Sequence, residues 1–277
     1  MIGRIIKQVS NDYTVFNGKN YICKARGVFR NLKETPLVGD MVEFDENKKI
    51  ILKIKDRKNF LVRPSISNVD QALIVTSVKN PDFSSILLDK LLTIIEFNNI
   101  EPIICFTKLD LLNKEELKII KNYMDYYETI GYKVITNESR NLKNLFKNKI
   151  TVFTGQSGAG KSSLLNQLDS NLHLKTDDIS YALNRGKHTT RHTELFNFDG
   201  GMIADTPGFS AIDMNALKPI EIRDNMKEMF NALEHCKYRD CMHVKEDGCY
   251  ILNEIKKNKI LKERHENYLN FLGELWK

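Results

Sequence analysis

Short runs in which apolar and polar residues alternate fill the first part of the chain. Turn signals such as Asn17-Gly18 and Val38-Gly39-Asp40 separate these runs. Alternation with a period of two predicts strands, and several short strands at such close spacing predict a small β-barrel. An OB-fold is one such barrel, and its open face commonly binds oligonucleotides. The predicted strands cover Ile5-Ile6, Tyr13 to Phe16, Tyr21 to Ala25, Met41 to Phe44 and Ile50 to Ile54.

After Arg63-Pro64 the pattern changes, and apolar strand-like runs alternate with stretches of helical periodicity near 85–97, 114–128 and 161–168. This alternation predicts βαβ units around a mostly parallel sheet, in which ligands bind at the carboxyl ends of the strands. The predicted strands are Gln71 to Val78, Pro102 to Phe106, Lys133 to Thr136, Ile150 to Thr154, Glu194 to Phe198 and Met202 to Ala204.

Beyond Pro219 the pattern predicts one helix from Ile220 to Leu233 and another from about Leu252 to Leu275, with a Cys/His cluster between them. We therefore expect three domains: a barrel over 1–62, an α/β domain over 63–213 and a small helical domain over 214–277. A length of 277 residues also permits a single domain, although chains of this size usually divide.

Charge is distributed unevenly along a chain whose composition, 42% hydrophobic and 28% charged, is that of a soluble globular protein. Residues 1–64 hold 14 Lys and Arg against 7 Asp and Glu, so they carry the basic excess. A polyanionic partner for this segment is one interpretation, and a solvated lysine-rich surface is the other. The N-terminus turns polar after Ile6, which predicts neither a signal peptide nor a membrane span and favours the cytoplasm.

The clearest chemical motif has the pattern G-x-x-x-x-G-K-[ST], directly after the strand Ile150 to Thr154 and at the start of a helix. In this context the backbone N–H groups cradle a β-phosphate, Lys161 reaches the β- and γ-phosphates, and Ser162 offers its hydroxyl to Mg²⁺. The motif predicts binding of a nucleoside triphosphate with Mg²⁺. The predicted binding residues are Gly155, Gln156, Ser157, Gly158, Ala159, Gly160, Lys161, Ser162 and Ser163.

The phosphate loop does not show which base the protein binds, so a second motif must determine it. The sequence Thr107-Lys108-Leu109-Asp110, which follows an apolar strand, is the candidate. This T-K-x-D is a variant of the N-K-x-D motif with which GTPases read guanine. The Asp110 carboxylate can accept hydrogen bonds from N1–H and the exocyclic amine of guanine, a donor pair that adenine lacks. Taken alone, four residues are equally consistent with an ordinary strand-to-helix turn.

A third element supports the GTPase interpretation. The sequence Asp205-Thr206-Pro207-Gly208 follows an apolar run and matches D-x-x-G, in which Asp205 supports Mg²⁺ and Gly208 meets the γ-phosphate. Thr189 and Thr190 lie between it and the phosphate loop, where a switch threonine is expected. Because the base-reading motif precedes the phosphate loop here, the G domain is predicted to be circularly permuted.

The cysteines indicate a metal site, because Cys236, Cys241, His243 and Cys249 follow the spacing C-x4-C-x-H-x5-C. Three thiolates and an imidazole close a tetrahedral Zn²⁺ site, which is then structural. The alternative is a chance cluster of buried cysteines. The odd number of cysteines and their clustering argue against a disulfide framework and for a reducing compartment.

Together, the OB-like barrel, the permuted motif order and the zinc spacing resemble the family of ribosome small-subunit-dependent GTPase A proteins, RsgA. The resemblance covers essentially the whole chain. It implies a factor that binds the small ribosomal subunit late in its maturation and hydrolyses GTP when the subunit stimulates it. It also implies contacts of the barrel and the zinc-binding unit with ribosomal RNA. We expect a monomer with no membrane partner.

Two positions depart from the family pattern. Thr107 replaces the usual Asn and shortens a side chain that bridges base and phosphate loop, which predicts slightly weaker binding. The H-T-T-T run ends in Arg191, which leaves the Mg²⁺ ligand open between Thr189 and Thr190.

The group that orients the attacking water is also open, because Phe209 stands where many GTPases have a glutamine. His188 is the candidate, and a contact with RNA or solvent alone is its alternative role.

Two other functions use the same residues. One is a nucleotide-gated RNA-binding scaffold with negligible turnover, which phosphate release would distinguish. The other is an ATP-using transferase or kinase, against which Asp110 argues.

Overall fold

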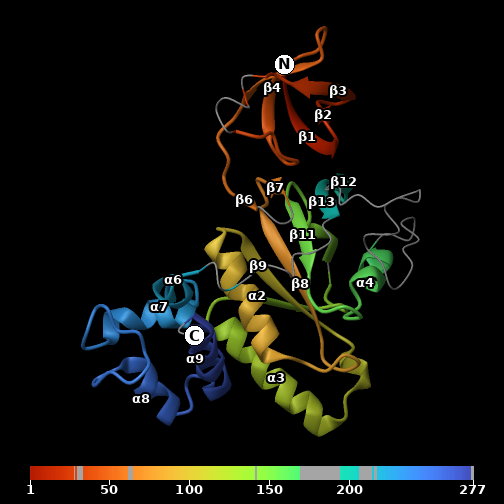
Figure 1. Cartoon of the computed structure of the whole chain (residues 1–277). Helices are drawn as coiled ribbons and strands as arrows, with labels where there is room; N and C mark the ends of the chain where they lie inside the picture. The colour runs from red at the N-terminus through yellow and green to blue at the C-terminus, as the bar shows by residue number, and fades with distance from the viewer. Residues whose placement is uncertain are drawn as a thin grey trace. The chain divides into compact units, whose positions relative to one another are not determined.

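The computed structural model describes residues 1–27, 29, 34–61, 65–140, 142–168, 194–205, 214 and 217–275. The chain forms two compact units (Figure 1). The first contains residues 1–73, 138–154 and 160–211, and the second contains residues 74–137, 155–159 and 212–277. Both units are therefore assembled from segments far apart in the sequence. The predicted domain boundaries at 62 and 213 stay predictions.

The predicted five-stranded barrel is confirmed in the first unit. Neighbouring strands pair antiparallel, except that β3 and β5 run parallel, and the pairing of β1 with β4 closes the barrel. Side chains that alternate along the strands, among them Ile5, Val15 and Phe44, are fully buried inside. The strands are β1 (Ile2–Val9), β2 (Asp12–Phe16), β3 (Asn20–Ala25), β4 (Met41–Asp45) and β5 (Ile50–Ile54).

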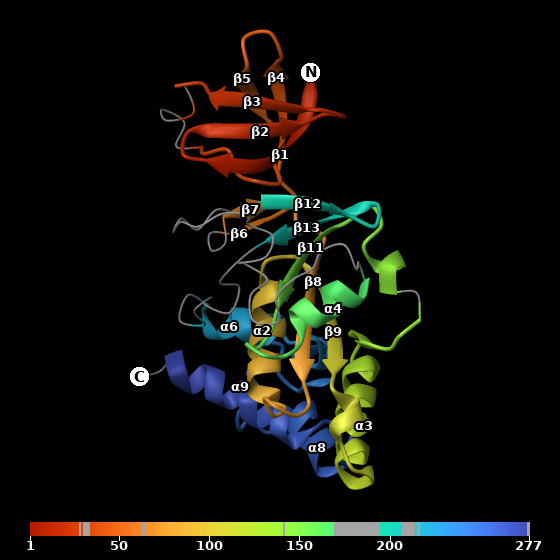
Figure 2. The same cartoon turned by 90° about the vertical axis from the view of Figure 1, so that its right-hand side faces the viewer.

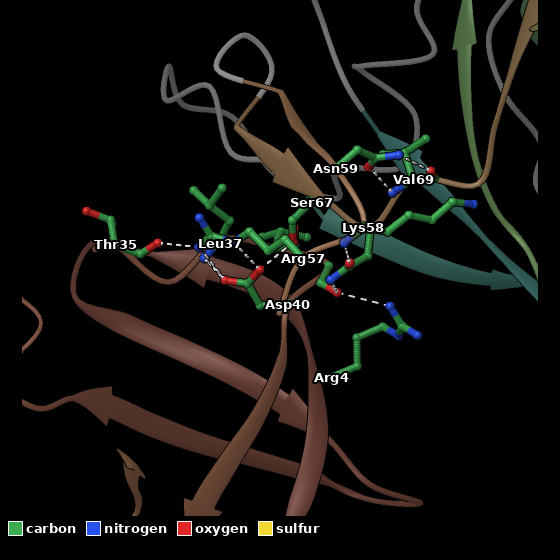
Figure 3. A network of polar contacts seen from close by, with 12 residues as sticks. Arg4, Thr35, Leu37, Asp40, Arg57, Lys58, Asn59, Ser67 and Val69 are labelled. Atoms are coloured by element: carbon green, nitrogen blue, oxygen red, sulfur yellow. Dashed lines mark hydrogen bonds and ion pairs between the residues drawn. The ribbon is translucent and has the colours of Figure 1, made fainter. Parts of the chain in front are cut away.

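A buried carboxylate fixes the segment that leaves the barrel (Figure 3). Asp40 accepts hydrogen bonds from Nε and Nη2 of Arg57, both at 2.7 Å, from Oγ of Ser67 at 2.6 Å and from the Leu37 N–H at 2.7 Å. Gly39 packs so closely that a Cβ would lie 2.0 Å from the Ser67 carbonyl oxygen. The chain leading into the small hairpin of β6 (Phe60–Leu61) and β7 (Ile66–Ser67) is therefore held on the barrel.

The first unit also contains three strands from the middle of the chain. β11 (Ile150–Thr154) runs parallel to β13 (Gly201–Asp205), and β12 (Glu194–Phe198) is antiparallel to β13. β12 then meets β1 of the barrel, where Lys7 Nζ lies 2.6 Å from Glu194 Oε2.

In the second unit, β9 (Glu101–Thr107) lies between β8 (Gln71–Ser77) and β10 (Lys133–Thr136), which pairs parallel with it. Almost every residue of β8 and β9 is buried, as expected for strands covered on both faces. Helix α2 (Ser85–Phe97) begins at an Ser84 cap, and α3 (Lys114–Thr129) begins at a capping box formed by Asn113 and Glu116.

The prediction of two long helices in the C-terminal region is wrong, because the structure breaks each of them into shorter helices. In place of 220–233 the structure has α6 (Pro219–Asp224), α7 (Lys227–Asn231) and a 3-10 turn. Met226 is extended there, and the Asn225 side chain caps α6 by donating to the Glu221 carbonyl. In place of 252–275 it has α8 (Tyr250–Lys256) and α9 (Lys262–Leu275), separated by Asn258 in the left-handed conformation.

These helices share one apolar core with α2. Ile94 of α2 is buried together with Met226, Tyr268 and Phe271. Figures 1 and 2 both show α9 alongside α2. Among the described residues no helix combines the length and apolar character needed to cross a membrane.

Candidate functional site

The phosphate loop forms the turn between β11 and α4 (Lys161–Leu168), as the sequence predicts. Gly155, Gly158 and Gly160 all have positive φ values of 126°, 75° and 93°. A Cβ on Gly155 would lie 2.0 Å from the Val75 carbonyl oxygen, so no side chain fits there. The glycines thus allow the close, left-handed backbone that a phosphate cradle needs.

The lysine that follows the loop is only partly accessible to water. Burial lowers the pKa of Lys161, because a charged ammonium loses solvation there. An anion such as a triphosphate would oppose that effect and favour the charged form. Ser162, the next residue, is buried on the first turn of α4.

The base-reading motif is hydrogen-bonded to the phosphate loop by two consecutive side chains. The Thr107 hydroxyl donates to the Ala159 carbonyl at 2.7 Å, and Lys108 Nζ donates to the Gly158 carbonyl at 2.8 Å. The shorter Thr107, which is buried, thus still reaches the phosphate loop. Because a peptide unit is planar, a carbonyl turned toward Thr107 directs the next N–H the opposite way. These bonds therefore orient the loop backbone.

Asp110 is exposed, in the 3-10 turn Leu109–Leu111 directly after β9, where a base can reach it. β10 runs parallel to β9 and ends beside it, and the Asn137 N–H donates to the Phe106 carbonyl at 3.2 Å. Asn137 therefore lies at the same sheet edge, although no sequence motif marks it. The carboxyl-end rule, applied to the strand Lys133–Thr136, was the signal available for finding it.

The structure covers the Mg²⁺ and switch predictions only in part. Asp205 is the last residue of β13, which runs parallel to β11 with Val152 opposite Ala204. Its backbone thus ends at the same edge as the start of the phosphate loop. The side chain of Asp205, and His188, Thr189, Thr190 and Gly208 entirely, lie outside the described residues.

The four predicted zinc ligands come together in the second unit. Their ligand atoms all lie within 4.8 Å of one another, and His243 Nδ1 is 3.6 Å from Cys236 Sγ and 3.4 Å from Cys249 Sγ. Typical zinc bond lengths at the tetrahedral angle place neighbouring N and S ligands about 3.6 Å apart. Cys236, Cys241, His243 and Cys249 therefore fit a closed Zn²⁺ site.

Hydrogen bonds around the cluster prepare it for a metal. His243 Nε2 lies 2.9 Å from the Met229 carbonyl, which assigns the proton to Nε2 and leaves Nδ1 free to bind zinc. Burial lowers the pKa of His243, which favours the neutral imidazole that a metal requires. The Glu246 carboxylate accepts from the Met242 and Val244 N–H groups, each at 2.7 Å, and so holds the ligand loop.

A basic groove of about 600 Å³ lies on the barrel. Ile22 at its wall is 62% exposed, which is unusual for a large apolar side chain. The charge count placed the basic excess in this segment of the sequence but could not say which face carries it. The charged lining consists of Lys24, Arg26, Lys48 and Lys49 against the single acid Asp12.

Comparison with protein families gives two matches. The RsgA GTPase model matches residues 54–215, and the RsgA N-terminal domain model matches residues 2–50. Together they cover both the barrel and the nucleotide-binding motifs.

Among curated proteins, the chain is similar to small ribosomal subunit biogenesis GTPase RsgA 2 of Oceanobacillus iheyensis, with 49% identity over 99% of this chain and 97% of the relative. Small ribosomal subunit biogenesis GTPase RsgA of Bacillus pumilus is 48% identical with the same coverage.

Among solved structures, YloQ, described as a circularly permuted GTPase, matches with a TM-score of 0.84 and 36% identity over 99% of this chain and 94% of YloQ. YjeQ from Thermotoga maritima matches with a TM-score of 0.84 and 32% identity over 99% and 98% of the two chains.

Proposed function

Because this GTP hydrolase belongs to the RsgA GTPase family, we propose that it binds the small ribosomal subunit and acts late in its assembly, hydrolysing GTP to GDP and phosphate when the subunit stimulates it. The names of the relatives support the partner and the process. The main support for the proposed nucleotide site is the pair of hydrogen bonds from Thr107 and Lys108 to the phosphate-loop carbonyls. They link base recognition and phosphate binding in one site.

In this proposal the nucleotide is held at three places. The phosphate-loop amides and Lys161 bind the β- and γ-phosphates, and Asp110 accepts the two guanine donors. Lys108 covers the ring with its stem. Ser162 and Asp205, with Thr189 or Thr190, would hold Mg²⁺, which would neutralise the charge that develops on the phosphate oxygens as the bond to GDP breaks. Preorganised donors at the developing charge account for catalysis.

His188 is the proposed water-positioning residue, since Phe209 cannot orient a water molecule. The support is its place in the switch segment and the proton affinity of imidazole near neutral pH. His188→Ala should leave GDP affinity unchanged and lower stimulated turnover by about 10² or more. Unchanged stimulated turnover would remove His188 from the mechanism.

Ribosomal RNA is the proposed ligand of the barrel groove. The support is the excess of cationic side chains around exposed Ile22, because basic grooves with exposed apolar surface suit nucleic-acid backbones and bases. Subunit affinity should fall steeply between 50 and 200 mM salt. A Lys48→Ala, Lys49→Ala double variant should show weaker binding and a shallower salt slope. Lys118→Ala with Lys121→Ala, which removes two exposed lysines of α3, is the matched control.

Phosphate release with and without purified small subunits tests the enzyme against the scaffold alternative. We expect slow basal hydrolysis and a large stimulation by the subunit, both abolished by Lys161→Ala. A flat response of the wild type would favour a nucleotide-gated scaffold. Equal affinity of the wild type for ATP and GTP would refute the role of Asp110.

We take the working unit to be a monomer in the cytoplasm, where ribosomal subunits are assembled. Light scattering with GDP and with a non-hydrolysable GTP analogue tests the first of these. A stable dimer in either state would contradict it.

A further inference from the structure

Arg264 of α9 lies in a fully buried ionic cluster of the second unit. Its side chain, 1% exposed, donates to carboxylate oxygens of Asp89 on α2 and Glu228 on α7. Tyr127 donates to the same Asp89 oxygen at 2.6 Å. Two carboxylates therefore share one guanidinium, and neutral donors complete the coordination.

Asn267, one turn further along α9, extends this cluster to the beginning of α2. Its Nδ2 lies 2.7 Å from Asp89 Oδ2 and 3.2 Å from Ser85 Oγ. Ser85 is the first residue of α2, directly after its cap. α9 therefore fixes the first turns of α2 with directional polar contacts as well as apolar packing.

The loop just before α2 contacts the nucleotide-binding segments. The Asn80 carbonyl accepts a hydrogen bond from Lys108 Nζ, which also binds the Gly158 carbonyl. Pro81 Cδ lies 3.6 Å from the point where a Cβ on Gly158 would stand, so the loop packs against the phosphate loop. Movement of the first turn of α2 would shift this loop.

An adjacent face of α9 contacts the zinc-ligand loop. His265 Nε2 lies 2.7 Å from the carbonyl of the ligand His243, and the Tyr268 hydroxyl donates to the Met242 carbonyl at 2.6 Å. α9 thus bonds to the zinc loop with two residues and to α2 with Arg264 and Asn267. All these groups belong to one compact unit.

We propose that Arg264 and Asn267 are positioning residues for nucleotide binding, which hold α2 and the 79–83 loop so that the zinc-binding unit contributes to the affinity for guanine nucleotide. The proposal rests on the proposed phosphate-loop site. A buried ion cluster is a poor way to gain stability alone, since apolar side chains of the same volume often do as well. Its directional bonds specify one register of α9 on α2, which is the best attested use of buried polar groups.

The main test uses Asn267→Leu in the full chain, because this change removes two hydrogen bonds and leaves no charge unpaired. Binding of a fluorescent GDP analogue should weaken roughly 2- to 30-fold, the range found for variants that alter coupling between sites. Amide exchange in residues 79–83 should accelerate. A second variant, Asp89→Asn with Glu228→Gln and Arg264→Met, removes all three charges together and should weaken GDP binding in the same direction.

A matched control separates positioning from general destabilisation. Ile251→Ala opens the same helical core on α8 without touching the polar cluster, and should keep wild-type GDP affinity. Chelation of zinc should weaken GDP binding by the wild type and have a smaller effect on Asn267→Leu. Wild-type affinity in both cluster variants, or an equal loss in Ile251→Ala, would overturn the proposal. If Lys161→Ala still binds GDP, the phosphate-loop assignment fails instead.

Discussion

Two buried carboxylates, Asp40 in the first unit and Asp89 in the second, are stabilised in different ways. Among the described residues, Asp40 has one cationic partner, Arg57, in a bidentate pair, and it also accepts from backbone and hydroxyl donors. Asp89 shares Arg264 with a second carboxylate, Glu228. Correspondingly, burial raises the pKa of Asp89, although Arg264 and two neutral donors oppose the shift.

A buried carboxylate paired with an arginine therefore has a different role in each unit. The pair in the first unit is balanced in charge and joins segments fewer than thirty residues apart, which fixes the exit of the barrel chain. The cluster in the second unit joins residues 175 positions apart and sets two carboxylates against one guanidinium. Such an arrangement is more sensitive to loss of its cation, and variants of Arg264 and Arg57 measure that difference.

Removing zinc should give the largest effect, confined to the second unit. Structural zinc contributes on the order of 10 kcal/mol in zinc-finger peptides. With a chelator, or in Cys249→Ser, amide protection should be lost in 236–249 and α9, while the barrel around Asp40 keeps its protection. Equal loss in both units would mean that they unfold together and that the comparison does not hold.

Arg264→Met should be next, at about 3–5 kcal/mol of lost unfolding free energy, because two buried carboxylates lose the cation that they share. Urea denaturation measures it. The variant with Asp89→Asn and Glu228→Gln added should recover much of that loss, since no buried charge is then left unpaired. Failure to recover would show that packing of the arginine stem, rather than charge, dominates.

Arg57→Met should cost less, about 1–3 kcal/mol, because its side chain is 18% exposed and water can partly replace it at Asp40. The same denaturation experiment gives the value. Lys55→Met, which breaks an exposed pair with Glu43 on the same barrel, is the control and should change stability by less than about 1 kcal/mol. A loss as large as that of Arg264→Met would mean that Asp40 depends on its arginine as strongly as Asp89 does.

Tyr268→Phe should have the smallest effect and lower the free energy of unfolding by about 1 kcal/mol. It removes one hydrogen bond to the Met242 carbonyl and leaves the ring in place. Zinc affinity, measured by competition with a chromogenic chelator, should fall slightly. No change in either quantity would mean that α9 holds the zinc loop through His265 alone.

Much of the fold could be predicted because its signals are local. The barrel strands alternate with a period of two, and the phosphate loop lies between a recognisable strand and helix, so neighbours in sequence define both. The zinc ligands span only fourteen residues, and the structure brings them into one cluster. The broken C-terminal helices were missed because Asn225 and Asn258 end helices through conformations that apolar periodicity does not report.

The motifs of the candidate site could be predicted from the sequence, but the contacts between them could not. Thr107 was expected to shorten the side chain that bridges base and phosphate loop, and the structure shows that its hydroxyl still bonds to the Ala159 carbonyl of the loop. Asn137 was missed because it carries no motif and reaches the edge only through the parallel pairing of β10 with β9.

By itself the sequence determined the strand and helix types, the permuted order of the nucleotide motifs, the zinc ligand set and the family. Each depends on short motifs whose residues are close in the chain, and on the order in which those motifs occur. Only the tertiary structure decided that α9 holds α2 through Arg264, Asn267 and Asp89, and that the lysines of the barrel gather around Ile22. Such contacts join residues far apart in sequence, and only the packing of the folded chain determines which of the many possible partners meet.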